Sequence, residues 1–167
     1  MANPYLPPKA KTHTWLTPPD LFAKLNSEFD FTLDSYATPE NALCDRYYTR
    51  DDGKVYQRGS WKYHRVFANP PYDSRSLAWC AEKALTEIFF GCELVVMLAP
   101  VKTDQPWFHM LWNHQPDTDV EYRWVRGRLV FGRPLVFGRP EQNSKSHSAP
   151  FPSVIIIIKR ADNGPKS

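Results

Sequence analysis

The 167-residue chain lacks any long hydrophobic run. Its most apolar stretch, Val154 to Ile158, is far too short to cross a bilayer and is typical of a buried strand. The first 14 residues contain no apolar core of a secretory signal. The cysteines Cys44, Cys80 and Cys92 form no CxxC pair, so we expect neither a disulfide framework nor a zinc knuckle. These absences predict a single soluble domain in a reducing cytoplasm.

The chain also lacks a strong excess of charge of one sign, since its formal net charge is only +3. The charge is unevenly distributed, however, because the segment 121–140 contains one acid, Glu121, and several arginines. These arginines are Arg123, Arg126, Arg128, Arg133 and Arg139. Such a local excess is typical of a surface that binds phosphate groups. A solvated basic face without a ligand is the alternative interpretation.

Motifs of metal and nucleophile chemistry are missing as well. His109 and His114 are five positions apart, which does not place them on one helix face, and no HExxH pattern occurs. Neither a GxSxG nor a P-loop pattern is present. We therefore expect no metal site.

Alternating helix and strand patterns run along the chain. A helix is expected over 18–28, with Thr17 as its N-cap and prolines in its first turn. Further helices are expected over 74–90, with Ser74 as the cap, and over about 103–112. Strand patterns occur at 31–34, 65–69, 94–99, 120–125, 128–132 and 153–159. This order predicts an α/β sheet whose last strands are antiparallel.

The predicted strand ends suggest where a ligand would bind. Ligands of an α/β sheet lie beyond the carboxyl ends of its strands. Asp34 and Asn69 each stand at the last position of a predicted strand. We therefore expect the two side chains to line one crevice.

The sequence Asn69-Pro70-Pro71-Tyr72 follows the predicted strand 65–69 and has chemistry of its own. Its prolines fix φ and carry no N–H, so the turn is stiff and its carbonyls meet few local donors. The Asn69 side-chain carbonyl and a backbone carbonyl could together accept both hydrogens of a planar exocyclic amine. Tyr72 offers a flat surface on which a base could stack. An ordinary proline turn that closes a strand is the alternative.

Several short motifs, taken in order, resemble those of a known enzyme family. They are WLTPPDLFAKL, LDSYAT, NALCDRYYT, a tryptophan at 61, ANPPY, GRLVFG and FPSVIIII. This set resembles the compact phage-type DNA N6-adenine methyltransferases, the Dam family of phages. The resemblance implies a compact, Rossmann-like class I methyltransferase sheet, S-adenosylmethionine as the cofactor and DNA as the partner, in a bacterial host cytoplasm. It divides the chain into a flexible arm (1–14), a single methyltransferase domain (15–160) and a tail (161–167).

The resemblance also implies roles for individual residues. Asn69 and Pro70 would accept hydrogen bonds from the adenine N6 amine, while Pro71 stiffens the turn and Tyr72 stacks on a flipped base. Asp34 would bind the ammonium group of the cofactor. The full set expected around S-adenosylmethionine is Trp15, Thr17, Pro18, Asp34, Ala37, Trp61 and Asn69. The set expected to contact DNA is Arg126, Arg128, Lys145 and His147.

The sequence departs from the usual methyltransferase pattern in its glycines. No glycine occurs before Gly53, and LDSYAT stands where a Gly-rich loop usually follows the first strand. No clear acidic residue marks the ribose site, for which Asp45 and Asp52 are the candidates. The cofactor contacts are therefore less well defined by the sequence than the Asn-Pro-Pro-Tyr chemistry.

Several alternatives stay open at this point. Because Asn-Pro-Pro-Tyr can serve any planar amine, cytosine N4 or an RNA base could replace adenine as the substrate. A catalytically silent DNA-binding protein on the same scaffold and a purely structural protein belong to other classes. Target recognition is expected from loops, namely the arm before Trp15, residues 102–118 or residues 126–148. The sequence leaves open whether the protein is a monomer or a homodimer.

Overall fold

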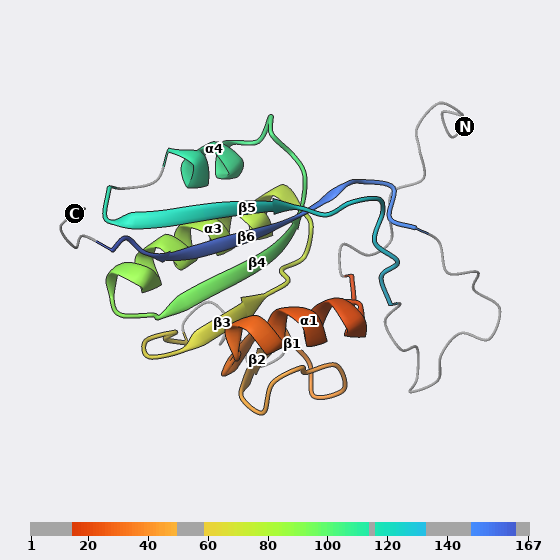
Figure 1. Cartoon of the computed structure of the whole chain (residues 1–167), viewed down its shortest axis with the longest axis horizontal. Helices are drawn as coiled ribbons and strands as arrows, with labels where there is room; N and C mark the ends of the chain where they lie inside the picture. Colours follow the sequence, from red (N-terminus) through yellow and green to blue (C-terminus); the bar gives the residue numbers. More distant parts are fainter. Residues whose placement is uncertain (1–14, 50–58, 114–115, 133–147, 163–167) are drawn as a thin grey trace, which may run out of the picture.

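A computed structural model of the chain describes residues 15–49, 59–113, 116–132 and 148–162. The described strands form one sheet with helices on both faces (Figure 1). The helices are α1 (Pro19–Phe29), α3 (Ser74–Phe89) and α4 (Pro106–Trp112). The strands are β1 (Leu33–Ala37), β2 (Tyr47–Thr49), β3 (Arg65–Ala68), β4 (Leu94–Pro100), β5 (Thr118–Trp124) and β6 (Ser153–Arg160).

The sheet has six strands in the order β2-β1-β3-β4-β6-β5. The pairs β1–β2, β1–β3 and β3–β4 are parallel, whereas β6 runs antiparallel to both β4 and β5. Asp34 of β1 lies opposite Phe67 of β3, which in turn lies opposite Val96 of β4. The predicted class, a mainly parallel α/β sheet of Rossmann-like type with an antiparallel last strand, is confirmed.

The helices lie on opposite faces of the sheet, as β5 shows residue by residue. The Tyr122 ring lies 5.4 Å from the Phe108 ring of α4. The next residue, Arg123, places its guanidinium 5.3 Å from the centre of the Phe29 ring of α1 and pairs with Glu28 at 2.7 Å. Because successive strand residues point to opposite faces, α1 and α4 cover opposite sides. Helix α3 lies with α4, behind the sheet in Figure 1.

The core lies on the two central apolar strands. All seven residues of β4 are buried, and so are the first six of β6, Ser153 to Ile158. A strand covered on both faces can be apolar at every position, which explains the unbroken run of β-branched residues in β6. The prediction that this run is a buried strand is confirmed.

Several strand boundaries differ from the prediction. β1 begins at Leu33 rather than at residue 31, because the Phe31 N–H donates to Asn26 Oδ1 (2.8 Å) at the end of α1. Asp34 is therefore the second residue of its strand and not the last. The short strand β2 lies in a stretch where no strand was predicted, since its Tyr-Tyr-Thr sequence is too brief for a periodic signal.

The predicted strand at 128–132 is wrong. This segment makes one isolated antiparallel bridge, between Gly132 and Leu16, and has no ladder with the sheet. The predicted helix at 103–112 begins only at Pro106, where proline suits the first turn.

Both predicted helix caps are also wrong. Pro18 is the N-cap residue of α1, and no side chain caps this helix. The N-cap of α3 is Asp73, whose carboxylate accepts hydrogen bonds from the Ser76 N–H (2.8 Å) and the Ser76 hydroxyl (2.7 Å). A carboxylate at this position also suits the positive end of the helix dipole better than a hydroxyl does.

Some predictions fall outside the described residues. These are the arm at 1–14, the part of the tail from 163 onward, Asp52, Lys145, His147 and residues 133–147 of the segment 126–148. Within the described ranges, no helix has the length and apolar character needed to cross a membrane.

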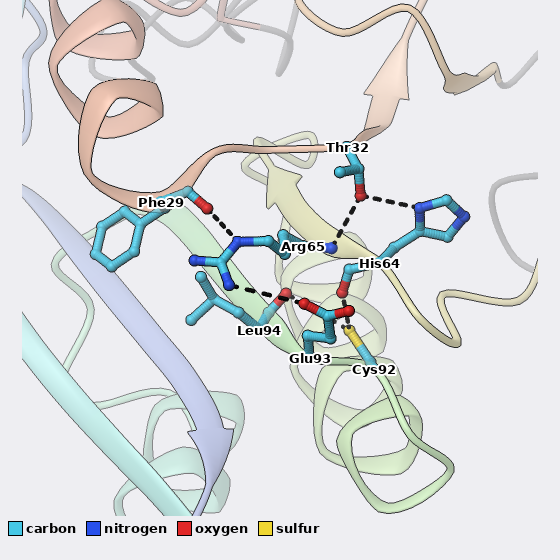
Figure 2. Close-up of polar contacts among 7 residues, drawn as sticks. All are labelled: Phe29, Thr32, His64, Arg65, Cys92, Glu93 and Leu94. Carbon is cyan, nitrogen blue, oxygen red and sulfur yellow. Dashed lines mark hydrogen bonds and ion pairs between the residues drawn. The ribbon is translucent and has the colours of Figure 1, made fainter.

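The amino edge of the sheet is held together around Arg65 (Figure 2). Its guanidinium Nε donates to the Phe29 carbonyl at the end of α1, and Nη1 lies 3.7 Å from Glu93 Oε2. Thr32 Oγ1 accepts from the Arg65 N–H (3.0 Å) and lies 3.0 Å from His64 Nδ1. These contacts fix the end of α1 to β3 and to the start of β4, away from the carboxyl edge.

Trp61 belongs to a second structural cluster, beside α3. Its side chain is fully buried, and its backbone N–H donates to Glu87 Oε2 at 2.8 Å. Lys83 Nζ lies 2.7 Å from Glu87 Oε1, 5.1 Å from the Trp61 ring centre and 5.6 Å from that of Trp79. The Lys83 and Glu87 side chains are only 10% and 12% exposed. The pair therefore carries charge in a largely desolvated place.

Replacing Glu87 by Gln should destabilise the fold, because Lys83 would keep a desolvated charge without its carboxylate partner. We expect the free energy of unfolding, measured by urea denaturation, to fall by roughly 2–3 kcal/mol. Glu82→Gln, the same change at an exposed position of α3, should stay within about 0.5 kcal/mol of the parent protein. Equal small effects of both substitutions would contradict this role of the pair.

Candidate active site

A cleft lies at the carboxyl ends of β1 and β3, next to the start of α1. Its volume is about 260 Å³, near the lower end of the range of small-ligand sites, roughly 300–1,000 Å³. It is lined by Trp15, Leu16, Thr17, Asp34, Tyr36, Glu40, Asn41, Leu43, Phe67 and Asn69. The strand order thus brings Asp34 and Asn69 into one crevice, although β1 begins later than predicted.

The predicted cofactor residues are only partly brought together. Trp15, Thr17, Asp34 and Asn69 all line the cleft. The remaining predicted contacts, Pro18, Ala37 and Trp61, are not among its lining residues. Trp61 instead lies in the cluster with Lys83 and Glu87.

The Asn69 side chain follows the last residue of β3 and has a defined orientation. Its Nδ2 donates to the Trp15 carbonyl oxygen at 2.6 Å and to Thr17 Oγ1 at 2.9 Å. Because a backbone carbonyl can only accept a hydrogen bond, the amide nitrogen must face Trp15. The Asn69 Oδ1 atom is buried and accepts no hydrogen bond from any of the described residues. A buried acceptor without a donor is costly, so this oxygen is suited to receive one from a ligand.

The Asp34 carboxylate holds the loop that follows β1. Its Oδ1 accepts from the Tyr36 N–H (3.3 Å) and its Oδ2 from the Leu43 N–H (3.1 Å). Burial raises the pKa of Asp34 to about 6, although these two hydrogen bonds act in the opposite direction. Asp34 therefore changes its charge within the cleft near pH 6.

The LDSYAT segment, predicted to stand in place of a Gly-rich loop after the first strand, instead comprises β1 and Thr38. The loop that follows β1 is 38–43, and it is stabilised by side chains. The Thr38 N–H donates to Asn41 Oδ1 (2.7 Å), and the Asn41 and Ala42 N–H groups donate to the Thr38 carbonyl. The Asp34 carboxylate accepts the Leu43 N–H at the end of this loop. Side-chain acceptors thus shape a turn here that needs no glycine.

Tyr72 is buried, with 5% of its surface exposed. Its ring makes edge contacts with Phe131 at 6.0 Å and with Phe151 at 5.5 Å. Burial raises the pKa of the Tyr72 hydroxyl. A base could stack on Tyr72 only after Phe131 or Phe151 had moved.

Comparisons with known proteins show the family of the chain. The profile of the family described as DNA N-6-adenine-methyltransferase (Dam) matches residues 6–166. The chain belongs to this family. The resemblance predicted from the ordered motifs is thereby confirmed.

A DNA N-6-adenine-methyltransferase of Escherichia phage T1 is similar in sequence. It is 28% identical over 124 residues, which cover 74% of this chain and 49% of the phage protein. The match therefore spans about half the length of this relative.

In this Dam-family chain, one side of the cleft is formed by the segment 15–17. The sequence analysis did not predict that this segment contacts Gly132. The Gly132 N–H donates to the Leu16 carbonyl at 3.0 Å. A Cβ atom at position 132 would lie 3.1 Å from Leu16 Cβ, so a side chain here would require the Leu16 side chain to shift slightly. Trp15 adds a tilted ring contact with Phe131 (5.5 Å) and an edge contact with Phe151 (5.3 Å). The GRLVFG motif thus contributes a supporting segment for the cleft rather than a strand.

Other lining residues were missed because they give no local signal. Glu40 lines the cleft from the 38–43 loop, whereas the expected ribose candidate Asp45 is exposed and is not a lining residue. A hydrogen bond from Thr38 lowers the pKa of the Glu40 carboxyl. Glu40 lies outside any strand, so the expectation that the ribose-binding acid ends a strand does not identify it.

Arg126 and Arg128 directly follow β5 and are exposed. β5 runs parallel to β4, because both are antiparallel to β6, so both arginines follow a strand that ends at the carboxyl edge with the cleft. Arg123, by contrast, is neutralised by Glu28 and Glu121. Within the described ranges, neither Arg126 nor Arg128 forms an ion pair.

Among the residues that the structure describes, no group of three or more His, Cys, Asp or Glu side chains could hold a metal ion.

Proposed function

We propose that this protein transfers a methyl group from S-adenosylmethionine to the N6 amine of a flipped adenine in DNA. The observation that carries the proposal is the buried Oδ1 of Asn69, an acceptor without a donor on a residue that lines the cleft. The Dam-family membership and the name of the phage T1 relative support adenine N6 as the target.

Asn69 and Pro70 would activate the amine by accepting its two hydrogens. The nitrogen lone pair of adenine N6 is delocalised into the ring, and two acceptors on the hydrogens favour the pyramidal geometry that a nucleophile needs. Asn69 Oδ1 would take one hydrogen and the Pro70 carbonyl the other. Since both groups follow directly after β3, they would be held in place before the substrate arrives.

The lining of the cleft fits the chemical groups of S-adenosylmethionine. When bound, this cofactor supplies a sulfonium methyl that is already activated toward nucleophiles. Asp34 would bind the ammonium group, whose charge would offset the cost of burying the carboxylate. Glu40 would accept hydrogen bonds from the ribose hydroxyls, and Trp15 and Phe67 would cover the apolar surface.

The DNA would approach from the carboxyl edge of the sheet. A target base must leave the duplex to reach Asn69, because its N6 amine is otherwise engaged in pairing. Tyr72 would stack on this base after the aromatic cluster with Phe131 and Phe151 opens. Arg126 and Arg128, together with Lys145 and His147 outside the described residues, would contact phosphates. The reaction would take place in the cytoplasm of the host cell.

The Asn69→Ala variant should lose methyl transfer to unmethylated DNA by at least about 100-fold in kcat, because a buried acceptor of the reacting amine is removed. Methyl-labelled S-adenosylmethionine, followed by digestion of the DNA to nucleosides, measures the product. Thr86→Ala, an alanine substitution at an exposed position of α3, should keep the parent activity.

The outcomes of this assay and of a DNA-binding measurement distinguish the candidate functions. Label in N6-methyladenine that is lost with Asn69→Ala supports the proposal, whereas label in N4-methylcytosine would keep the chemistry and overturn the substrate. Binding of DNA without any transfer would identify a silent DNA-binding protein.

Affinity for S-adenosylmethionine should decrease as the pH falls through about 6, where Asp34 becomes protonated. The ammonium of the cofactor stays charged between about pH 5 and pH 7, since α-amino groups titrate near pH 8. Calorimetry should show Kd roughly fivefold to tenfold higher at about pH 5 than at about pH 7. Asp34→Asn should weaken binding and abolish this dependence, whereas the exposed Asp119→Asn should leave it unchanged. A pH-dependent Kd that persists in Asp34→Asn would contradict the assignment.

A further inference from the structure

We infer that Thr17 is a positioning residue for methyl transfer, acting through the Asn69 amide and not through the cofactor. This inference rests on the proposed function, because it concerns how Asn69 Oδ1 is presented to the amine. It differs from the role that the sequence suggests for Thr17, which is a cofactor contact.

The argument begins with the geometry of a primary amide. Its oxygen and nitrogen are nearly equal in size, but the oxygen accepts a hydrogen bond and the nitrogen donates two. If Asn69 turned its nitrogen toward the cleft, the amine of the base would meet a donor instead of an acceptor. The reaction therefore needs one defined orientation of this side chain.

Two hydrogen bonds define that orientation. The Trp15 carbonyl at 2.6 Å selects the nitrogen, because it cannot donate. Thr17 Oγ1 at 2.9 Å engages the second hydrogen of the same nitrogen. With the Trp15 contact alone, the amide could still rotate about a single hydrogen bond. With both contacts, its plane is fixed and Oδ1 stays unpaired at the cleft.

The Thr17 hydroxyl is available for this task because the helix does not use it. Thr17 precedes the N-cap residue Pro18, and no side chain caps α1. The segment that carries Thr17 is itself anchored by the bridge between Leu16 and Gly132. Thr17 and Asn69 are 52 positions apart in the sequence, and their hydrogen bond joins the segment before α1 to the turn after β3.

The Thr17→Val variant tests the inference, because valine keeps the shape of threonine and removes its hydroxyl. We expect kcat for DNA methylation to fall by about 10- to 100-fold, as for a small misplacement of a reacting group. Kd for S-adenosylmethionine should stay within about twofold, since the hydroxyl acts on Asn69. Thr17→Ser should restore kcat to within about threefold of the parent. Thr86→Val, at an exposed position of α3 outside the segments expected to recognise DNA, is the matched control.

A second measurement does not depend on catalysis. Exchange of the Asn69 side-chain amide protons, followed by NMR in the cofactor-free protein, should be slow for both protons in the parent and faster in Thr17→Val. Thermal melting verifies that each variant is folded. If Thr17→Val unfolds, the comparison of Thr17→Ala with Thr17→Ser takes its place.

The outcomes separate this inference from the proposed function. Unchanged kcat in Thr17→Val, or a loss of cofactor affinity as large as the loss of kcat, would overturn the positioning role. Unchanged amide exchange would overturn it as well. If the parent protein transfers no methyl group to DNA while the exchange still depends on Thr17, the proposed function fails and the Thr17–Asn69 contact stands.

Discussion

The hydrogen bond between Asn69 Nδ2 and the Trp15 carbonyl is the contact on which the site depends. It joins the turn after β3 to the segment before α1, two parts of the chain that no secondary structure connects. Because the carbonyl can only accept, the bond also decides which atom of the amide is left without a partner. The Leu16–Gly132 bridge and the contacts of Trp15 with Phe131 and Phe151 hold that carbonyl in place.

The second constraint is the loop between β1 and β2, which takes the place of a Gly-rich loop. Asp34 accepts the backbone N–H of Tyr36 in β1 and that of Leu43 in this loop while lining the cleft. One buried carboxylate therefore has both a structural role and a proposed role in binding the cofactor. A compact chain can combine the two because a carboxylate has more acceptor positions than two N–H groups occupy. The raised pKa of Asp34 is the consequence of that burial.

The sequence predicted those parts of the fold that depend on local patterns. The apolar runs of β4 and β6, the amphipathic helix α3 and the strand before Asn69 are visible in the order of the residues. The Asn-Pro-Pro-Tyr motif also identified the residue with the unpaired oxygen. The parts that were predicted wrongly depend on contacts across the chain. Thr17 looks like a helix cap, but its hydroxyl contacts Asn69 instead.

The same reason explains the other differences. Residues 128–132 have the composition of a strand, yet Gly132 meets Leu16, which lies far away in the sequence, and forms only a bridge. Tyr72 was expected to present a free face, but the positions of Phe131 and Phe151 follow from the tertiary packing. Burial of Trp61 beside Lys83 likewise requires knowledge of where α3 lies. Local patterns predict elements, whereas the composition of a site depends on how they meet.

A crystal structure of the protein with S-adenosylhomocysteine and a DNA duplex that it methylates tests the central claim most directly. The account predicts a flipped adenine whose N6 lies about 3 Å from Asn69 Oδ1, with Nδ2 still bound to the Trp15 carbonyl. An Asn69 amide that turns its nitrogen toward the base, or an adenine N6 held by other groups while Oδ1 stays unpaired, would contradict it.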